Sequence, residues 1–364
     1  MEKLFYFIFL LSSISALSQK KIIDTLSKEP ISFSEMYSEK GEILGTTNYY
    51  GEISEEELLK IKNLNIKEIY FHHNNYQSKH ISYQELSNLN TIYLLPSQID
   101  KINNLDEVIV LSNIKKKYKK LTAYFRSIQY NNNQPQYYMD GIVEYYISLK
   151  NGKIKFNILQ NRSLKDNNIK QIDEKGLIRL NFNLAGVLNL SDFVDFKKLE
   201  SEYTIQQKDN SFSIAKENLE IGKIITNNNN TFLNMEIYSE KNPKIMKLFG
   251  TESILKNYTV NAIYEKNEDV NKLKNVEYIK EYREYKIKQR KDLEYTSINV
   301  INEIYIIDKA FTDTKSQSGN PYFTFITESN YKEDFWINIL KNNYITPVPE
   351  TVELFIEKKL SESK

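Results

Sequence analysis

The side chains best suited to metal binding are three histidines that lie close together in the chain, His72, His73 and His80. Imidazole is a common ligand of transition metals, so one interpretation is a metal site. The alternative is a strand end and turn that holds histidines for no functional reason. Adjacent strand residues point to opposite faces, and the H-E-x-x-H spacing is absent. The sequence therefore predicts no metal site.

Other catalytic patterns are also missing. The chain has no cysteine, which excludes disulfides, thiolate metal sites and cysteine nucleophiles. A Ser–His–Asp triad needs a positioned histidine, and all three histidines lie in one short segment. None of the ten glycines completes a dinucleotide loop, a P-loop or a G-x-S-x-G turn. We predict no catalytic residue and no cofactor.

A pair of carboxylates is the one catalytic arrangement that a sequence does not reveal. Glycoside hydrolysis needs only two acids at a set separation, and the chain has 48 Asp and Glu residues. No pair stands out from this number. A carboxylate-pair hydrolase is therefore the least favoured function.

Aromatic residues are the most unusual feature of the composition, with 27 tyrosines and 18 phenylalanines. Tyrosine offers a flat apolar ring with a polar tip, which suits the binding of a glycan or a peptide. Aromatic residues also stabilise sheets through cross-strand packing, and we expect this role for most of them. A third interpretation is a concave apolar sheet that carries lipid or a lipidated protein. Adjacent tyrosine pairs stand at positions 49–50, 137–138 and 145–146.

Charge excludes one class of partner. The chain has 49 Lys and Arg against 48 Asp and Glu, a formal net charge of +1. Binding to nucleic acid needs a basic surface that displaces counterions. We therefore expect no nucleic-acid partner.

The first residues have the three parts of a secretory signal peptide. Lys3 gives a short positive start, Leu4 to Leu11 is an apolar run, and small residues lead to Ser18. We predict cleavage between Ser18 and Gln19. The rival interpretation, a membrane anchor, needs about 20 apolar residues, and serines interrupt the run too early. No later stretch is long and apolar enough to span a membrane.

The compartment follows from this leader and from the missing cysteines. An exported chain without disulfides fits a bacterial periplasm better than a eukaryotic secretory route. Without cysteine there is also no lipid-modified N-terminal residue. We expect an exported protein, periplasmic or associated with the outer membrane, that is not a lipoprotein.

Residues 19–111 show short alternating apolar runs separated by turn residues, a pattern typical of a small β-sandwich. Ile31 and Phe33 are expected on one face of a strand, and a run from Ile66 ends at Asn74-Asn75. One segment differs: Ser54 and Glu57 form a capping-box pattern that predicts a short helix.

This block resembles the carboxypeptidase-regulatory-like domain of Gram-negative envelope proteins, a transthyretin-like β-sandwich. The resemblance covers about a quarter of the chain and implies a structural or docking role without catalytic residues. Asn75 stands where the family has glycine, and asparagine tolerates a left-handed backbone. Tyr50 stands where an aspartate is usual. The matching elements are Ile22-Ile23-Asp24 with residues 29–33, then residues 45–53, 71–78 and 105–110.

The rest of the chain is predicted to be a larger antiparallel β domain, residues 121–364, joined by a basic linker at residues 112–120. The linker is either solvated or, in a sharper interpretation, in contact with anionic lipid. Alternating runs around Asn151-Gly152 predict a type I′ hairpin. Residues 276–289 fit a helix or a strand, and we favour a strand because aromatics suit pleated surfaces. Other expected strands cover residues 178–184, 203–206, 232–238, 258–264 and 293–307, and expected helices cover 191–199 and 349–360.

Taken together, these features predict a mainly β, two-domain, exported protein that is not an enzyme. The leading hypothesis is a cell-envelope protein that binds or scaffolds another envelope component, which is a protein, a glycan or a lipid. The alternative is a periplasmic carrier of lipid or lipidated protein on a concave β-sheet.

Overall fold

A computed structural model describes residues 19–97, 116–166, 184–190, 203–208, 211–226, 230–239, 241–248, 250–266, 275–290, 292–315, 328–332, 334–339, 341 and 345–362. The chain divides into two compact units. Unit 1 contains Met1–Glu39 and Leu44–Ser97, and unit 2 contains Lys40–Ile43 and Gln98–Lys364. The expected leader, residues 1–18, and its cleavage site lie at or beyond the edge of the described residues.

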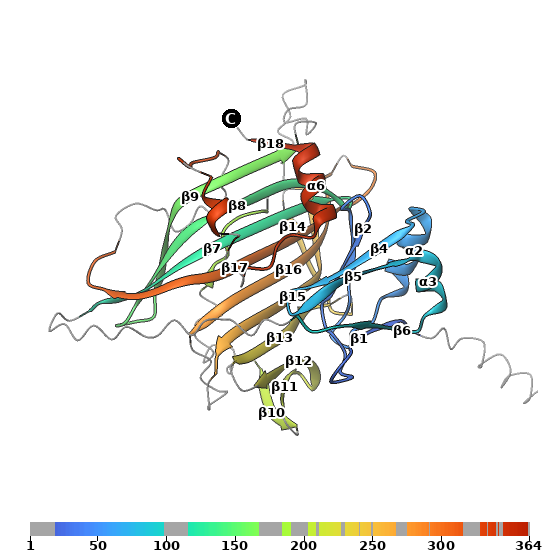
Figure 1. Ribbon diagram of the computed structural model, residues 1–364, viewed down its shortest axis with the longest axis horizontal. Coiled ribbons are helices and arrows are strands. Elements are labelled where there is room, and N and C mark those ends of the chain that lie inside the picture. The colour runs from blue at the N-terminus through green and yellow to red at the C-terminus, as the bar shows by residue number, and fades with distance from the viewer. Residues whose placement is uncertain are drawn as a thin grey trace, which may run out of the picture. The chain divides into compact units, whose positions relative to one another are not determined.

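Unit 1 is built from two small sheets and two short helices (Figure 1). One sheet pairs β1 and β6 in parallel, and the other has the order β3-β2-β4-β5. Its core contains buried aliphatic residues from both sheets together with Phe71. The elements are β1 (Lys21–Asp24), β2 (Glu35–Ser38), β3 (Ile43–Thr46), α2 (Glu55–Asn63), β4 (Glu68–His73), β5 (Tyr76–Ser82), α3 (Tyr83–Asn88) and β6 (Thr91–Leu94).

Helix α2 begins at the predicted capping box. Ser54 Oγ accepts from the Glu57 backbone N–H at 3.2 Å, and Glu57 Oε2 accepts from Ser54 N–H at 2.8 Å. The other Glu57 oxygen accepts from Thr46 N–H at 2.9 Å, which ties the helix to β3. A Cβ at Gly45 would lie 2.0 Å from that oxygen, so only glycine fits there. The capping prediction is confirmed.

Two details of unit 1 differ from the sequence prediction. Ile31 and Phe33 are buried, but they lie in an irregular segment before β2, and Phe33 has a φ of +60°. Asn75 does not have a positive φ, so the left-handed turn expected there is wrong. The β4–β5 connection is instead held by the Asn75 N–H, which donates to His73 Nδ1 at 3.2 Å. The expected closing strand at residues 108–110 lies outside the described residues.

Unit 2 is a single twelve-stranded antiparallel sheet. Its order is β10-β11-β12-β13-β15-β16-β17-β7-β8-β9-β18, with β14 paired to β15. The strands are β7 (Tyr118–Asn131), β8 (Gln134–Ser148), β9 (Ile154–Asp166), β10 (Thr204–Lys208), β11 (Ser211–Lys216), β12 (Leu219–Thr226), β13 (Asn230–Tyr238), β14 (Lys244–Leu248), β15 (Thr251–Glu265), β16 (Val276–Lys288), β17 (Thr296–Thr312) and β18 (Leu360–Glu362).

The tight hairpin turns lie at unexpected places. Asn132 and Asn133 both have positive φ and join β7 to β8, as a type I′ turn requires. At the predicted site only Gly152 has a positive φ, and Ser148 N–H donates to Lys153 O across a longer loop. The hairpin at Asn151-Gly152 is therefore confirmed, but its type I′ geometry is wrong.

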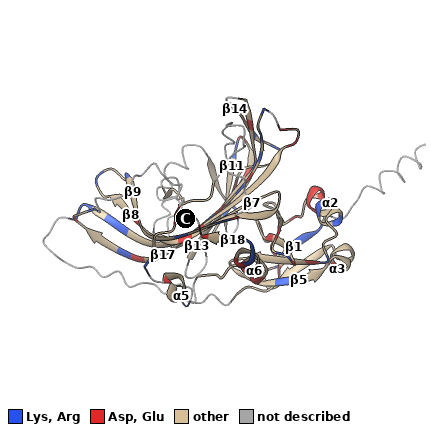
Figure 2. Cartoon of the chain, turned by 90° about the horizontal axis from the view of Figure 1, so that it is seen from above, with Lys and Arg blue, Asp and Glu red and all other residues tan. Residues whose placement is uncertain are grey.

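The two faces of the large sheet differ in what covers them. The outer face packs against α5 (Phe335–Ile339), and α6 (Glu350–Lys359) lies on the same side in Figure 1. The inner face carries the main apolar cluster, which includes Val187, Leu188 and Leu190. Figure 2 shows β11 and β14 bending away from the side of α5, so the inner face is concave.

Most of the expected elements of unit 2 are present. Residues 276–288 form strand β16, and the C-terminal helix is α6. Lys119 and Lys120, expected in the linker, are the second and third residues of β7. The strand expected at 178–184 lies almost wholly outside the described residues, and the helix at 191–199 lies wholly outside them. Within the described part of the chain, no helix is both long and apolar enough to cross a membrane.

Candidate functional site

The three histidines do not converge. His72 is buried, and its Nδ1 lies 3.0 Å from Ser78 Oγ. His73 packs edge-on against Tyr76, and His80 stacks on Tyr70 with ring centroids 5.4 Å apart. Within the described residues, no three His, Asp or Glu side chains are grouped to hold a metal ion. Each histidine has a local structural role in the β4–β5 hairpin.

Tyrosines lie mainly inside the two units. Tyr145-Tyr146 is buried as a pair, and Tyr138 is buried beside half-buried Tyr137. Tyr50 is exposed, and its ring packs edge-on against Tyr49. The other exposed aromatic residues in the described part of the chain are Tyr93, Tyr295 and Phe311. The aromatic residues therefore pack within the sheets and do not form the exposed platform considered above. The largest fully buried side chains include Tyr37, Tyr124, Tyr130, Tyr145 and Tyr264.

The inner face of the large sheet carries the main cluster of buried apolar side chains. Side chains from ten strands contribute to it. These strands are β7–β9, β11–β13 and β15–β17, together with β10 at the margin. In most strands they come from every second position, because alternate strand residues share a face. In β12 and β16 the spacing changes at an irregularity in the strand pairing. Phe125 lies over Gly141 of the next strand, where a Cβ would meet its ring at 2.6 Å. All of these side chains are buried or partly buried, so the cluster forms the core of unit 2.

Residues 184–190, which we call the inner segment, lie on this surface. The segment reads Leu-Ala-Gly-Val-Leu-Asn-Leu and has no regular strand or helix along most of its length. Ala185, Val187, Leu188 and Leu190 are all buried. The segment therefore contributes apolar side chains to the inner face without being a strand of the sheet.

Three side chains of the sheet hold the backbone of the inner segment. Ser127 Oγ accepts from Gly186 N–H at 3.0 Å, and Gln129 Oε1 accepts from Leu184 N–H at 2.6 Å. Tyr145 Oη donates to Leu188 O at 2.8 Å. All three side chains are fully buried. These bonds satisfy backbone groups that would otherwise be buried without partners.

Ser127 belongs to a polar row that crosses the inner face. It pairs directly with Asn302, which pairs with Glu281 on the next strand. Ser127 Oγ donates to Asn302 Oδ1 at 2.6 Å. Glu281 accepts from Tyr258 Oη at 2.7 Å and forms an ion pair with Arg283 at 2.6 Å. The row separates the main apolar cluster from a smaller one around Ile287, Ile298 and Val300, which Leu184 contacts.

The outer face has a matching row at the same level, but this row is charged. Its side chains stand directly opposite one another on five neighbouring strands, with alternating sign: Lys280, Glu303, Arg126, Asp140 and Arg162. All but half-buried Arg162 are buried. Alternating charges in direct cross-strand pairs stabilise a sheet, and desolvation makes each lost partner costly.

Asp140 is the centre of the charged row. It is completely buried and accepts two bonds from Arg162, at 2.7 and 3.0 Å. Tyr138 Oη donates to it at 2.9 Å and Tyr124 Oη at 3.2 Å. Burial raises the pKa of both tyrosines above the usual range, and so does the nearby carboxylate, which keeps them as neutral donors. Trp336 of α5 covers Arg162 at 4.1 Å from the ring centroid.

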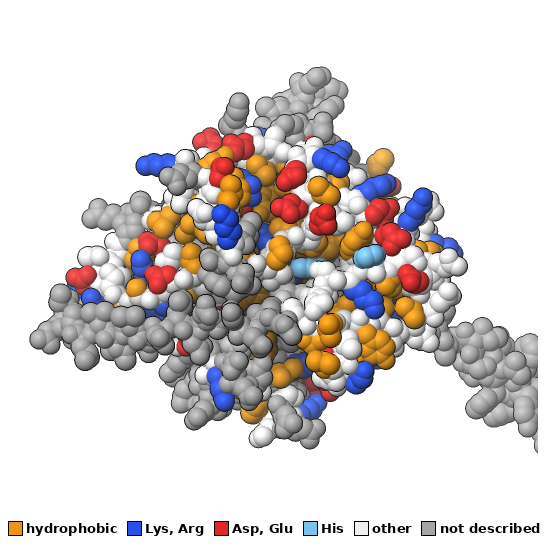
Figure 3. Space-filling view, viewed as in Figure 1, with side chains coloured by type: hydrophobic (Ala, Val, Ile, Leu, Met, Phe, Trp, Pro, Cys, Tyr) orange, Lys and Arg blue, Asp and Glu red, His pale blue; other side chains and the backbone are white. Residues whose placement is uncertain are grey.

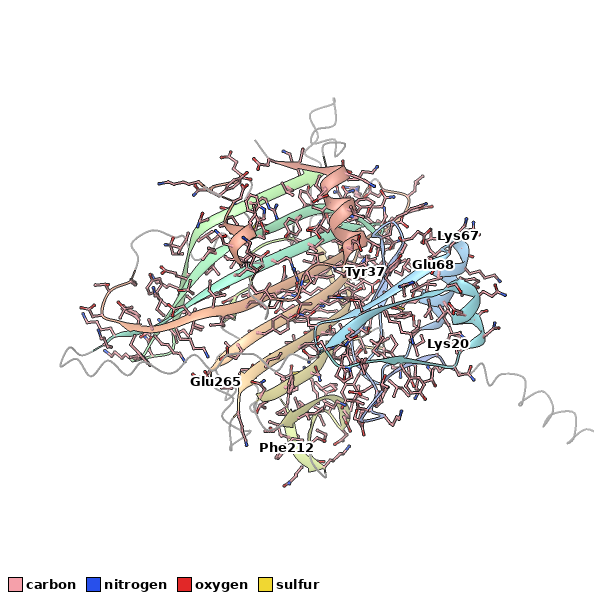
Figure 4. All side chains as sticks on the ribbon, in the orientation of Figure 1. Lys20, Tyr37, Lys67, Glu68, Phe212 and Glu265 are labelled. Carbon is pink, nitrogen blue, oxygen red and sulfur yellow. The ribbon has the colours of Figure 1, made fainter. Side chains whose placement is uncertain are left out.

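One carboxylate pair shares a lysine at the end of the sheet. Glu265, labelled in Figure 4, and Glu277 both bind Lys309. Burial raises the pKa of Glu277 to about 7 against the opposing effect of Lys309. Burial also acts to raise the pKa of Glu265, but hydrogen bonds from Lys309 and Asn275 outweigh it and lower that pKa. The pair is internally neutralised and forms a structural ion network.

Unit 1 has a surface pocket of about 450 Å³ between the end of α2 and the β4–β5 sheet. Lys67 and Glu68 of its rim are labelled in Figure 4. Its lining contains one carboxylate and no histidine, so it offers no acid–base pair. The inner face of unit 2 is the better candidate site.

Sequence reasoning did not identify the inner polar row or the inner segment. Gly186 and Leu184 bind residues that lie 59 and 55 positions earlier in the chain. The available signal was a set of polar residues, Ser127, Gln129 and Asn302, at inward positions of otherwise apolar alternating strands. Neither a scan against protein-family models nor a search of curated proteins finds a match for this chain.

Proposed function

We propose that this protein is a non-enzymatic binding protein of the cell envelope whose ligand is an acyl chain, carried by a lipid or a lipidated protein on the inner face of the large sheet. The observation that carries the proposal is the concave, apolar inner face with a non-strand segment resting on it. Burial of an acyl chain on such a face is favourable by about 0.8 kcal/mol per methylene.

The inner segment supports this function because the hydrogen bonds that attach it to the sheet are of a weak, neutral type that can be exchanged. Its backbone is held by neutral hydrogen bonds from Ser127, Gln129 and Tyr145. A neutral bond contributes about 1 kcal/mol net, far less than a buried ion pair loses when broken. An acyl chain that replaces Val187, Leu188 and Leu190 would restore the apolar contacts that the segment leaves.

The head group of an amphiphilic ligand would bind at the cluster of Tyr258, Glu281 and Arg283, which lies on the same inner face. Arg283 lies 4.5 Å from the Tyr258 ring centroid, and both contact Glu281. The Arg283 side chain is one-third exposed, whereas that of Glu281 is buried. A phosphate or carboxylate head group fits the guanidinium, whose planar donors match such anions.

Unit 1 is proposed to be the transthyretin-like sandwich that the resemblance implies, with a docking role in the periplasm or at the outer membrane. Its two sheets, β1-β6 and β3-β2-β4-β5, are compatible with that architecture. A protein that only scaffolds, using unit 1 and without a ligand on the sheet, is the second candidate. The resemblance of residues 19–111 alone favours it.

Co-purified lipid and a binding assay separate the two candidates. Mass spectrometry of the full chain should find stoichiometric co-purified lipid. After delipidation, a fluorescent fatty acid should bind the chain saturably in a titration. Ser127→Ala with Gln129→Ala should increase that binding, because the segment is released. The matched control Ser87→Ala, which removes an exposed serine hydroxyl of α3 in unit 1, should leave it unchanged. If the protein purifies without lipid and neither wild type nor the double variant binds the acyl probe, the carrier function is contradicted and the scaffolding function remains.

A further inference from the structure

The exposed end of the large sheet is a ribbon of three strands. Strand β14 pairs with β15 along residues 251–255, and these residues pair with the end of β16. We define the ribbon as residues 241–256 without Phe249, together with residues 286–295 without Lys291. Figure 2 shows β14 at the far end of the bent part of the sheet. Every residue of β14 is exposed, so this strand does not contribute to the packed core.

The ribbon exposes large apolar side chains on two segments of the chain. Leu293, in the turn between β16 and β17, is 92% exposed. Ile245, Met246 and Leu248 of β14 are each more than half exposed. Exposed single leucines are ordinary, but four large aliphatic residues on one ribbon tip mark a binding surface.

The two turns at the tip are held together. Tyr295 Oη donates to Glu252 of β15, and Lys288 Nζ donates to Leu293 O at 2.9 Å. A Cβ at Gly250 would lie 3.2 Å from Arg290 Cβ, which places the β14–β15 turn against the β16–β17 turn. The two turns, with Leu248 and Leu293 beside them, therefore lie at one tip of the ribbon.

Basic residues lie on both faces of the ribbon, because Lys244 shares a face with Met246 whereas Lys288 points the opposite way from Ile287. The ribbon has Lys241, Lys244, Lys247, Lys256, Lys286, Lys288 and Arg290 against Glu252, Asp292 and Glu294. The whole chain is close to neutral, so this positive excess is local. By contrast, basic and acidic side chains are interspersed over the face seen in Figure 3. Exposed apolar side chains together with lysines on both faces of the ribbon complement an anionic lipid surface, where each lysine is attracted and the leucines enter the acyl boundary.

We infer that this ribbon docks on the surface of an anionic lipid bilayer. Lysines on an edge strand disfavour addition of a strand from another protein, which weighs against a protein partner at β14. The register places Met246 and Leu248 on the same face as Ile287, which packs in the smaller inner-face cluster with Leu184. A docked bilayer would therefore adjoin the end of the inner face. The inference does not depend on whether that face takes an acyl chain.

Vesicle flotation of the full chain tests the inference. Wild type should float with vesicles of phosphatidylcholine and phosphatidylglycerol, should remain behind with phosphatidylcholine alone, and should be released by added salt. Met246→Asp with Leu293→Asp should abolish flotation. Lys244→Gln with Lys288→Gln should weaken it about 30-fold. The matched control Leu149→Asp, at an exposed position of the β8–β9 loop, should float like wild type.

Three results would overturn the inference. The first is that wild type does not float with anionic vesicles. The second is that the Met246→Asp/Leu293→Asp variant floats as wild type should. The third is self-association of wild type that this variant abolishes while vesicles have no effect, because a second copy would then cover the ribbon. Acyl-probe binding measured on the same variant should be unchanged, so failure of docking is distinguishable from failure of the proposed function.

Discussion

The two faces of the large sheet place polar residues at the same level and use them differently. On the outer face the row is charged, and Asp140 alone accepts four hydrogen bonds. On the inner face the row begins at Ser127 and Asn302, which are neutral, and Ser127 uses its hydroxyl to hold the inner segment. Ionic pairs fix the outer face in one arrangement. Neutral bonds to a non-strand segment leave the inner face able to exchange one apolar occupant for another.

The largest expected effect breaks the outer row. Asp140→Ala leaves Arg162 without its bidentate partner and two buried tyrosine hydroxyls without an acceptor. We expect the free energy of unfolding in urea to fall by about 3–5 kcal/mol. Lys208→Gln, which removes an exposed pair with Glu220, is the control and should change it by less than about 1 kcal/mol. A mild effect of Asp140→Ala would mean that the outer row does not fix this face.

The next largest loss of stability is expected on the inner face at Gly141, the residue after Asp140. Gly141→Ala would place a Cβ 2.3 Å from Gln160 O and 2.6 Å from the Phe125 ring. Overpacking of this kind costs about 1–3 kcal/mol, measured again by urea unfolding. Gly152→Ala, in an open loop at φ +67°, is the comparison and should cost about 1 kcal/mol through backbone strain alone. Equal losses would show that the inner face is loosely packed at Phe125.

A smaller and local effect is expected where the inner segment is attached. Ser127→Ala removes the acceptor of Gly186 N–H and should lower the free energy of unfolding by about 1 kcal/mol. Amide exchange at Gly186 should accelerate, while amides of β17 keep their protection. Acceleration that spreads over the whole sheet would show that the segment is part of the core and not a separable occupant.

The smallest effect is a pH dependence of the free energy of unfolding, which arises from Glu277 at the end of the sheet. Glu277 has a pKa of about 7, above its unfolded value, so the stability it contributes is present at low pH and is lost as pH rises toward 7. Glu265 is shifted in the opposite direction and offsets part of this. Glu277→Gln should remove a decline of about 1 kcal/mol between pH 5 and 7 in unfolding experiments. An unchanged pH profile would show that Glu277 does not titrate in this range.

The local elements were readable from the sequence because their signals are local. The capping box at Ser54 and Glu57 specified α2, and alternating runs specified the strands around Gly152 and at residues 276–288. Backbone geometry was less accessible. Asn75 and Asn151 were expected to have left-handed conformations, but the structure gives them to Asn132 and Asn133, because turn type depends on how the flanking strands pair.

The candidate site was not readable, because pairing across the sheet creates it. Arg126 meets Glu303 from 177 positions away, and Ser127 meets Asn302 from 175. Alternation told which residues share a face of one strand, but not which strands are neighbours. The order of strands that brings β17 beside β7 is a property of the whole chain.

The central claim is that the inner segment yields its place to an acyl chain. Hydrogen exchange of the full chain with and without a long-chain lysophospholipid tests it most directly, followed at the amides of Leu184 and Gly186, which donate to Gln129 and Ser127. We expect these two amides to lose protection when the lysophospholipid binds, while β17 stays protected. Unchanged protection of both amides at saturating lysophospholipid would contradict it.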